Sequence, residues 1–305
     1  MNLVFVYGTL RRHEANAHLL DKALRIAEQA WVYGTLYDTG DGYPALVPAE
    51  PGADKCSKVY GELYRVTKRQ LDILDELEGY EAGGNDNLYE RVVETVYTDG
   101  GAYEAYTYVF PSERAHGLQP IAWGDWKCHL RLPQPSIVSN PLSGGGDLEQ
   151  SWHYFAYGSC MDMERFVAHG VVDLFQNVVG RGVLKGYDLS FTHRSNVDGL
   201  GRADMLEKGG VVEGKVYCIS RAALDYLYVR EGVAQRVYRP TFVDVEVEGR
   251  VIRDVLTFVV VNKTEETPPS DEYAEELIRG AQTVVSSEYY QQLVEKIGRL
   301  KRVLQ

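Results

Sequence analysis

The chain of 305 residues lacks several features that would place it in a specialised class. Its four cysteines (Cys56, Cys128, Cys160 and Cys218) are scattered and form no Cys-x-x-Cys pair, which argues against a disulfide framework or a zinc site. No apolar run approaches the ~20 residues of a membrane helix. Met1 leads almost directly into an expected strand, which leaves no room for a signal peptide. We therefore expect a cytoplasmic protein with free thiols and no membrane partner.

Positive charge is also scarce. The chain has 32 Lys and Arg against 44 Asp and Glu, a formal net charge of −12. Such an acidic chain is a poor candidate for binding nucleic acid. The seven histidines show no metal-ligand spacing, so no metal is expected. A hydrophobic content of 45% is ordinary for globular proteins, and the length suits two domains.

Two short stretches, residues 4–10 and 154–160, share one pattern: an apolar run, then Tyr-Gly, then a small hydroxyl residue. The apolar run predicts a short buried strand, and glycine lets the backbone turn sharply after it. The residues that follow, 11–14 and 161–165, have a helix-compatible composition. Backbone N–H groups at such a break would point outward and could bind an anion or a developing oxyanion.

Other segments repeat in the same order, so the chain is predicted to be two copies of one fold. Residues 60–64 match 213–217, residues 71–80 match 224–233, residues 89–93 match 238–242, and residues 106–109 match 256–259. Clustered Pro and Gly mark a linker between the copies. The predicted domains are residues 1–131 and 151–305, joined by a linker at 132–150.

Each copy has mostly strand patterns with one or two helices. Alternation predicts strands at 59–66 and 211–219, each followed by a helix, at 68–77 and 221–230. Strands are expected next at 89–97 and 238–247, and a helical region from Ser270 to about Leu300. Both short helices stop at Glu-Gly, where glycine suits the left-handed position after a helix.

The glutamates at these helix ends, Glu78 and Glu231, are candidate acid–base residues. The negative end of the helix dipole disfavours a carboxylate there, and burial would raise its pKa further. A glutamate with a raised pKa can accept and return a proton near neutral pH. A solvated surface Glu beside a capping glycine is the simpler reading, but the same pattern occurs twice at a matched distance from a Tyr-Gly turn.

Both halves resemble the gamma-glutamylcyclotransferase-like family. The stretches 4–11, 42–47, 61–64, 74–79 and 89–91 resemble the gamma-glutamylamine cyclotransferase branch. The stretches 154–159, 186–191, 214–217, 231–238 and 269–290 resemble the branch that acts on gamma-glutamyl amino acids. The resemblance implies an α+β fold of two tandem domains, each a small mixed barrel-like β-sheet with flanking helices.

The resemblance also implies an activity, the release of 5-oxoproline from a small gamma-glutamyl substrate, with no metal or cofactor. It makes Glu78 and Glu231 the acid–base residues. The substrate-binding residues would be Tyr7, Gly8, Thr9, Leu10 and Tyr89 in the first half, and Tyr157, Gly158, Ser159, Cys160 and Tyr238 in the second. Cross-strand packing is the alternative role for Tyr89 and Tyr238. The oligomeric state is left open.

Two departures from the family pattern bear on this prediction. Cys160 stands where its branch usually has asparagine, so the second site could be altered or weakened, or Cys160 could act as a nucleophile. The segment 81–88 is longer than its counterpart 234–237, which suggests a larger lid over the first site. The alternatives are a metabolite-binding protein without turnover, one active and one degenerate half, or a scaffold that binds partners through its acidic surface.

Overall fold

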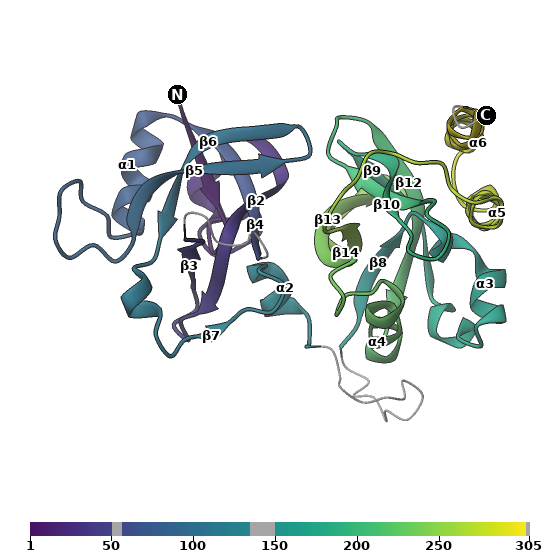
Figure 1. Ribbon diagram of the computed structural model, residues 1–305, viewed down its shortest axis with the longest axis horizontal. Helices are drawn as coiled ribbons and strands as arrows, with labels where there is room; N and C mark the ends of the chain where they lie inside the picture. The colour runs from purple at the N-terminus through teal and green to yellow at the C-terminus, as the bar shows by residue number, and fades with distance from the viewer. Residues whose placement is uncertain (51–56, 135–149, 303–305) are drawn as a thin grey trace. The chain divides into compact units, whose positions relative to one another are not determined.

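The structure, a computed structural model, describes residues 1–50, 57–134 and 150–302. The chain divides into two compact units, Met1–Pro133 and Gln134–Gln305. Most of the linker expected at 132–150, and also Cys56, lies outside the described residues. Each unit is an α+β domain built on a five-stranded mixed barrel, so the predicted tandem fold is confirmed (Figure 1).

The first unit contains eleven helices and strands among its described residues. They are β1 (Asn2–Val6), the 3₁₀ helix η1 (Ala17–Leu20), β2 (Leu24–Asp38), β3 (Pro44–Pro48), β4 (Lys58–Val66), α1 (Lys68–Leu77), β5 (Glu90–Thr98), β6 (Gly101–Val109), the 3₁₀ helix η2 (Ser112–Ala115), β7 (Gln119–Pro120) and α2 (Trp126–Arg131).

The first barrel has the strand order β2-β4-β1-β6-β5 and closes through pairing of β2 with β5. β1 is parallel to β6 and antiparallel to β4. Irregular register between Arg25 and Ala30 lets the long strand β2 bend, so that it also pairs with β3 and β7. Val4, Phe5 and Val6 of β1 are buried in the core, which fixes the position of the turn that follows β1.

The second unit repeats this order with added elements. It contains β8 (Trp152–Ala156), the 3₁₀ helix η3 (Ser159–Met161), α3 (Met163–Ala168), the 3₁₀ helix η4 (Val172–Phe175), β9 (Val178–Lys185), β10 (Asp188–Arg194), β11 (Gly201–Leu206), β12 (Val211–Ile219), α4 (Arg221–Arg230), β13 (Tyr238–Val247), β14 (Arg250–Val260), α5 (Asp271–Gln282) and α6 (Ser287–Arg302).

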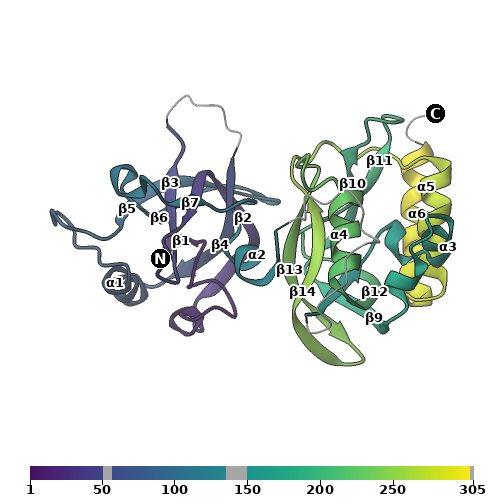
Figure 2. The same ribbon diagram turned by 90° about the horizontal axis from the view of Figure 1, so that it is seen from below.

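The second barrel is closed in the order β12-β8-β14-β13-β9, which matches the first barrel strand for strand. β8, like β1, is parallel to one neighbour and antiparallel to the other. The hairpin of β10 and β11 and the helices α5 and α6 are added around it. α5 and α6 lie side by side in both views (Figures 1 and 2).

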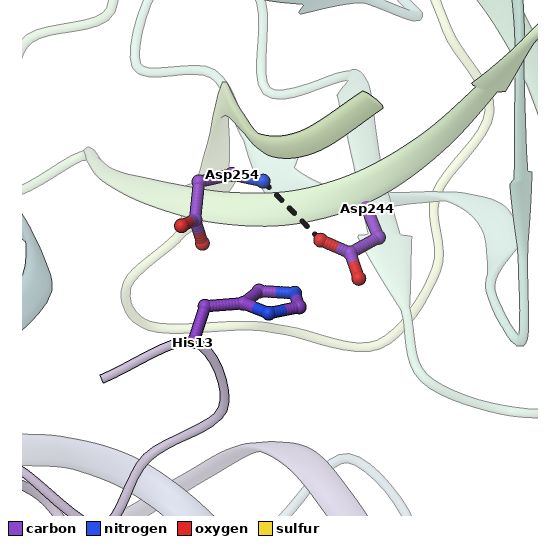
Figure 3. Close-up of side chains that lie close together, drawn as sticks. All are labelled: His13, Asp244 and Asp254. Carbon is purple, nitrogen blue, oxygen red and sulfur yellow. Dashed lines mark hydrogen bonds between the residues drawn. The ribbon is translucent and has the colours of Figure 1, made fainter. Parts of the chain in front are cut away.

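One bulge bends the β13–β14 hairpin of the second barrel. The register shifts between Val243 and Val245, and Asp254 takes a left-handed backbone conformation with φ of 49°. Aspartate tolerates this region better than most residues. The Asp254 N–H donates a hydrogen bond of 3.2 Å to Oδ1 of Asp244 (Figure 3). The bulge is therefore supported by a side chain of the same hairpin.

The helices α1 and α4 occupy the predicted ranges, and both begin with a hydroxyl N-cap and end at Glu-Gly. Thr67 caps α1 by accepting a hydrogen bond from the Gln70 N–H, and Ser220 caps α4 in the same way. Each helix buries its apolar face in its unit. Each ends at a glutamate followed by a left-handed glycine, Gly79 with φ of 61° and Gly232 with φ of 60°.

One expectation about helices was wrong. Residues 11–14 form turns, because Arg11 is drawn inward to Glu62 and Asp125, at 3.3 and 2.8 Å, and so cannot lie on a solvated helix. The helical region expected from Ser270 to about Leu300 is confirmed and consists of two helices, since Thr283 ends α5 before α6 begins. The side chain of Ser270 caps α5 by accepting a hydrogen bond from the Tyr273 N–H. No helix in the described part of the chain is long and apolar enough to span a membrane.

Candidate active site

The Tyr-Gly stretches form matching turns at the ends of β1 and β8. In the first, the Arg11 N–H donates to the Gly8 carbonyl at 3.1 Å, while the N–H groups of Thr9 and Leu10 have no acceptor among the described residues. In the second, the Met161 N–H donates to the Gly158 carbonyl at 3.0 Å and begins η3. The N–H groups that precede it have no acceptor within that helix. Both turns thus present main-chain donors.

The first turn lines a cavity of about 310 Å³. Its wall is mostly apolar and aromatic, and the only charged side chain in it, among the residues that the structure describes, is Glu78. The lining residues are Phe5, Val6, Tyr7, Gly8, Thr9, Leu10, Ala15, Asn16, Gly42, Tyr43, Pro44, Leu77, Glu78, Leu88, Tyr89 and Tyr108.

Glu78 takes its place from the end of α1. It is the C-cap residue, and the left-handed Gly79 then turns the chain away. Burial raises the pKa of Glu78 from its usual 4.5 to about 7. At neutral pH the carboxyl is therefore present in both its protonated and ionised forms, as a general acid–base requires.

Hydrogen bonds to backbone carbonyls hold the aromatic wall of the first cavity. The Tyr7 hydroxyl donates to the Tyr108 carbonyl at 2.7 Å, and the Tyr89 hydroxyl donates to the Pro44 carbonyl at 2.8 Å. A Cβ on Gly8 would lie 2.8 Å from the ring of Pro44, so the turn tolerates only glycine at this close approach. The tyrosines therefore fix the turn and the loop around the cavity.

The second turn lines a larger and far more polar cavity of about 420 Å³. Arginines and acids contribute much of its wall. The lining residues are Tyr154, Tyr157, Gly158, Ser159, Cys160, Arg165, His193, Ser195, Val197, Asp198, Arg202, Ala203, Arg230, Glu231, Gly232, Val237, Tyr238, Phe258, Ser270, Glu272, Tyr273 and Glu276.

Glu231 sits at the end of α4 as Glu78 does at the end of α1, but its neighbours differ. Its Oε1 lies 3.6 Å from Nε of Arg230 and 3.8 Å from Sγ of Cys160. Burial raises the pKa of Glu231, and the guanidinium of Arg230 opposes that rise. The carboxyl at the end of α4 is thus in contact with Cys160 of the turn after β8.

The tyrosine contacts of the first half recur in the second. The Tyr157 hydroxyl donates to the Phe258 carbonyl at 2.6 Å, and the Tyr238 hydroxyl donates to the Ala203 carbonyl at 2.8 Å. The Ala203 N–H donates in turn to the hydroxyl of Tyr273 on α5, at 3.2 Å. The added C-terminal helix therefore contributes directly to the wall of this cavity.

All twelve residues singled out in the sequence line one of the two cavities. In the first half these are Glu78 with Tyr7, Gly8, Thr9, Leu10 and Tyr89, and in the second Glu231 with Tyr157, Gly158, Ser159, Cys160 and Tyr238. Sequence reasoning missed Asn16, Arg165 and Arg230. Only Arg230 carried a signal, because it immediately precedes Glu231.

The two departures noted in the sequence have structural counterparts. Of the longer segment 81–88, only Leu88 lines the first cavity, and Asn87 holds the loop together through two hydrogen bonds with Glu81.

Cys160 is buried, and burial raises the pKa of its thiol. Its Sγ accepts a hydrogen bond of 3.1 Å from Arg230. A protonated thiol is a weak nucleophile, so this environment argues against covalent chemistry at Cys160.

The fold and the cavities define a class: a tandem pair of small mixed barrels, each with a carboxyl at a helix end and a glycine turn in one cavity. A family model described as gamma-glutamyl cyclotransferase, AIG2-like, matches residues 4–128, and one described as AIG2-like family matches residues 211–293. The chain belongs to the gamma-glutamylcyclotransferase family.

Relatives support this membership along the whole chain. A Bacillus subtilis protein named "Putative gamma-glutamylcyclotransferase YkqA" is 40% identical over 302 residues, covering 99% of both chains. The crystal structure of YkqA from Bacillus subtilis matches with a TM-score of 0.81 at 39% identity, covering 98% of both chains. The gamma-L-glutamyl-butirosin B gamma-glutamyl cyclotransferase of Niallia circulans is 37% identical over 136 residues, which is 44% of this chain and 81% of that protein.

Proposed function

We propose that each half releases 5-oxoproline from a small gamma-glutamyl substrate, with Glu78 or Glu231 as the general acid–base. One observation carries this proposal. In each half a largely buried carboxyl with a raised pKa lines the same cavity as a glycine turn that presents backbone N–H groups. The enzyme would thus have two sites in one chain, neither of which uses a metal or a cofactor.

In the first step the substrate cyclises on itself. The ionised carboxylate takes a proton from the substrate's α-ammonium group, and the free amine attacks its own γ-carbonyl carbon. A C–N bond forms, the carbonyl oxygen becomes an oxyanion, and the N–H groups of the turn stabilise it. Because the nucleophile belongs to the substrate, the site needs to hold it in position more than to activate it.

In the second step the protonated glutamic acid gives its proton to the nitrogen of the leaving amine. The bond between that nitrogen and the former carbonyl carbon breaks as the oxyanion collapses back to a carbonyl. The ring nitrogen gives its remaining extra proton to the departing amine. The products are therefore 5-oxoproline and the amine as its ammonium ion, and the glutamate returns to its starting form. A pKa near 7, as at Glu78, suits a group that must both take and return a proton.

The linings of the two cavities suit different leaving groups. The first presents an apolar and aromatic wall, which suits gamma-glutamyl amines. The second presents arginines, which suit a leaving amino acid that carries its own carboxylate. The Niallia circulans relative is named for gamma-L-glutamyl-butirosin B, so that compound belongs in the substrate panel.

The test is release of 5-oxoproline from a panel of gamma-glutamyl amines and gamma-glutamyl amino acids. The variants are Glu78→Gln and Glu231→Gln, singly and together, in the full chain. Matched controls are Glu76→Gln on α1 and Glu275→Gln on α5, because both side chains are exposed. We expect each single site variant to lose 10²-fold or more of the turnover of one half, on the order of a general acid–base contribution.

The double variant should then lose turnover of every substrate, while the controls keep it. Turnover that survives in the double variant would contradict the acid–base assignment. Binding of gamma-glutamyl compounds without any product in the wild-type protein would instead indicate a metabolite-binding protein. If Glu78→Gln abolishes all turnover and Glu231→Gln has no effect, the second half is a degenerate site.

A further inference from the structure

The two helix ends that present the glutamates differ at the preceding residue. Leu77 precedes Glu78 and lines the first cavity, whereas Arg230 precedes Glu231 and lines the second. The flanking glycines and the turns of the two halves otherwise correspond. At this position the second half has a permanent positive charge beside the carboxyl where the first half has an apolar side chain.

Arg230 connects the end of α4 to the turn after β8. Its Nη2 donates a hydrogen bond of 2.8 Å to Oγ of Ser159, and its Nε donates one of 3.1 Å to Sγ of Cys160. The same Nε lies 3.6 Å from Oε1 of Glu231. The Arg230 side chain is only 15% exposed, and its contacts hold the guanidinium in one place. Its positive charge therefore stabilises the ionised form of Glu231.

Other groups that face Glu231 are neutral or already paired. Arg165 of α3 acts on Glu231 from further away, and it is itself paired with Glu276 of α5. The Cys160 thiol and the hydroxyls of Tyr154, Tyr157, Tyr238 and Tyr273 have raised pKa values, so they are uncharged at neutral pH. Arg230 is therefore the dominant charge at this carboxyl.

The surroundings of Glu78 contain no comparable cation among the described residues. The groups that face it are the hydroxyls of Tyr7, Tyr89 and Tyr108, and their pKa values are all raised. Arg91 of the same unit is paired with Asp75. Neither residue of this pair lines the first cavity. Burial alone acts on Glu78.

We propose that Arg230 positions Glu231 and keeps it ionised at a pH where Glu78 is protonated, so that the second half works at lower pH than the first. A cation within 4–6 Å lowers the pKa of a carboxyl by roughly 1–3 units. The acid limb of the pH–rate profile of the second half should therefore lie below that of the first, and removal of Arg230 should raise it. The part that concerns turnover rests on the proposed function, while the ionisation of Glu231 can be measured directly.

The direct experiment is a ¹³C NMR titration of the side-chain carboxyl carbons in glutamate-labelled full chain. Glu78→Gln and Glu231→Gln assign the two resonances by their disappearance. We expect Glu231 to titrate at a lower pH than Glu78, and we expect Arg230→Leu to move the Glu231 titration upward by about 1 pH unit or more. Equal titration of the two groups, or a Glu231 titration that Arg230→Leu does not move, would overturn the proposal.

Three further variants separate charge from structure. Arg230→Lys keeps the cation and should hold the Glu231 titration within a few tenths of a pH unit. Arg221→Leu, at the other end of α4, should leave it in place because Arg221 pairs with Asp225 outside the cavity. Leu77→Arg introduces a cation at a position that is 38% exposed, and it should lower the pH at which Glu78 titrates. This reciprocal change tests the idea even if Arg230→Leu does not fold.

The kinetic experiment uses kcat/KM against pH in two backgrounds. Glu231→Gln reports the first half and Glu78→Gln reports the second, and adding Arg230→Leu to the latter should raise its acid limb by about 1 pH unit or more. An acid limb unmoved by Arg230→Leu would refute the link to catalysis. If no variant or wild type turns over any substrate, the proposed function fails, and the NMR titration still decides the role of Arg230.

Discussion

Burial of Glu78 makes the stability of the first unit depend on pH. The folded-state pKa of about 7 exceeds the usual 4.5, so folding favours the protonated form. The stabilisation from protonated Glu78 is fully present below pH 4.5 and is lost as pH rises through 7. At about 1.36 kcal/mol per pH unit, the loss amounts to about 3 kcal/mol. Because the side chain is partly exposed, solvent screening makes this figure an upper bound.

The perturbation that tests this reasoning is Glu78→Gln, which removes the charge and keeps the shape. The Gln variant should be more stable than the wild type above pH 7, by up to about 3 kcal/mol, and the advantage should vanish near pH 4.5. Urea-dependent hydrogen exchange read by mass spectrometry reports unfolding of the first unit apart from the second. A stability difference between variant and wild type that stays constant from roughly pH 5 to pH 8.5 would refute the argument.

The exposed Glu76, two residues earlier on α1, gives a matched control. Glu76→Gln should leave the pH dependence of the first unit as in the wild type. The control also separates the effect of a buried carboxyl from that of net charge, since both variants lose one negative charge.

The remaining predictions concern packing and buried charge. Arg11→Ala should destabilise the first unit by about 3–5 kcal/mol in urea unfolding, because the buried carboxylates of Glu62 and Asp125 would both lose the cation that joins them; a loss below about 1 kcal/mol would show that water or another group compensates for the lost cation. Gly214→Ala should cost about 1–3 kcal/mol, because its Cβ would lie 2.2 Å from the Ala156 carbonyl oxygen, and an unchanged melting temperature would contradict that clash. Gly298→Ala in α6, with open space around it, should instead stabilise by up to about 1 kcal/mol, and any destabilisation would count against the space inferred there.

Local signals let the sequence predict the elements that carry the site. The ranges of α1 and α4 were predicted from the strand patterns that precede them and from Glu-Gly at their ends, and both ranges are confirmed. The repeat predicted two domains of one fold, and the barrels match strand for strand. Local chemistry fixes such features within a few residues, so they can be read without knowledge of distant contacts.

Features set by distant contacts escaped prediction. The turns at 11–14 arise because Arg11 pairs with Asp125, a residue far away in the sequence. Closure of the first barrel depends on pairing between β2 and β5, which no local pattern encodes. Arg230 was overlooked because its role depends on where its side chain points from the last turn of α4. The catalytic assignment of the two glutamates remains a prediction for the experiments above.

The tyrosine hydrogen bonds also restrict where either half could be shortened. Tyr7 and Tyr157 stand just after the first strand of their units, and their acceptors, Tyr108 and Phe258, belong to the last strand of each barrel. Each turn is thus held in place only after the chain has been synthesised almost to the end of its barrel. Fragments that stop before either acceptor would lack this hydrogen bond, so during synthesis each cavity would be completed late.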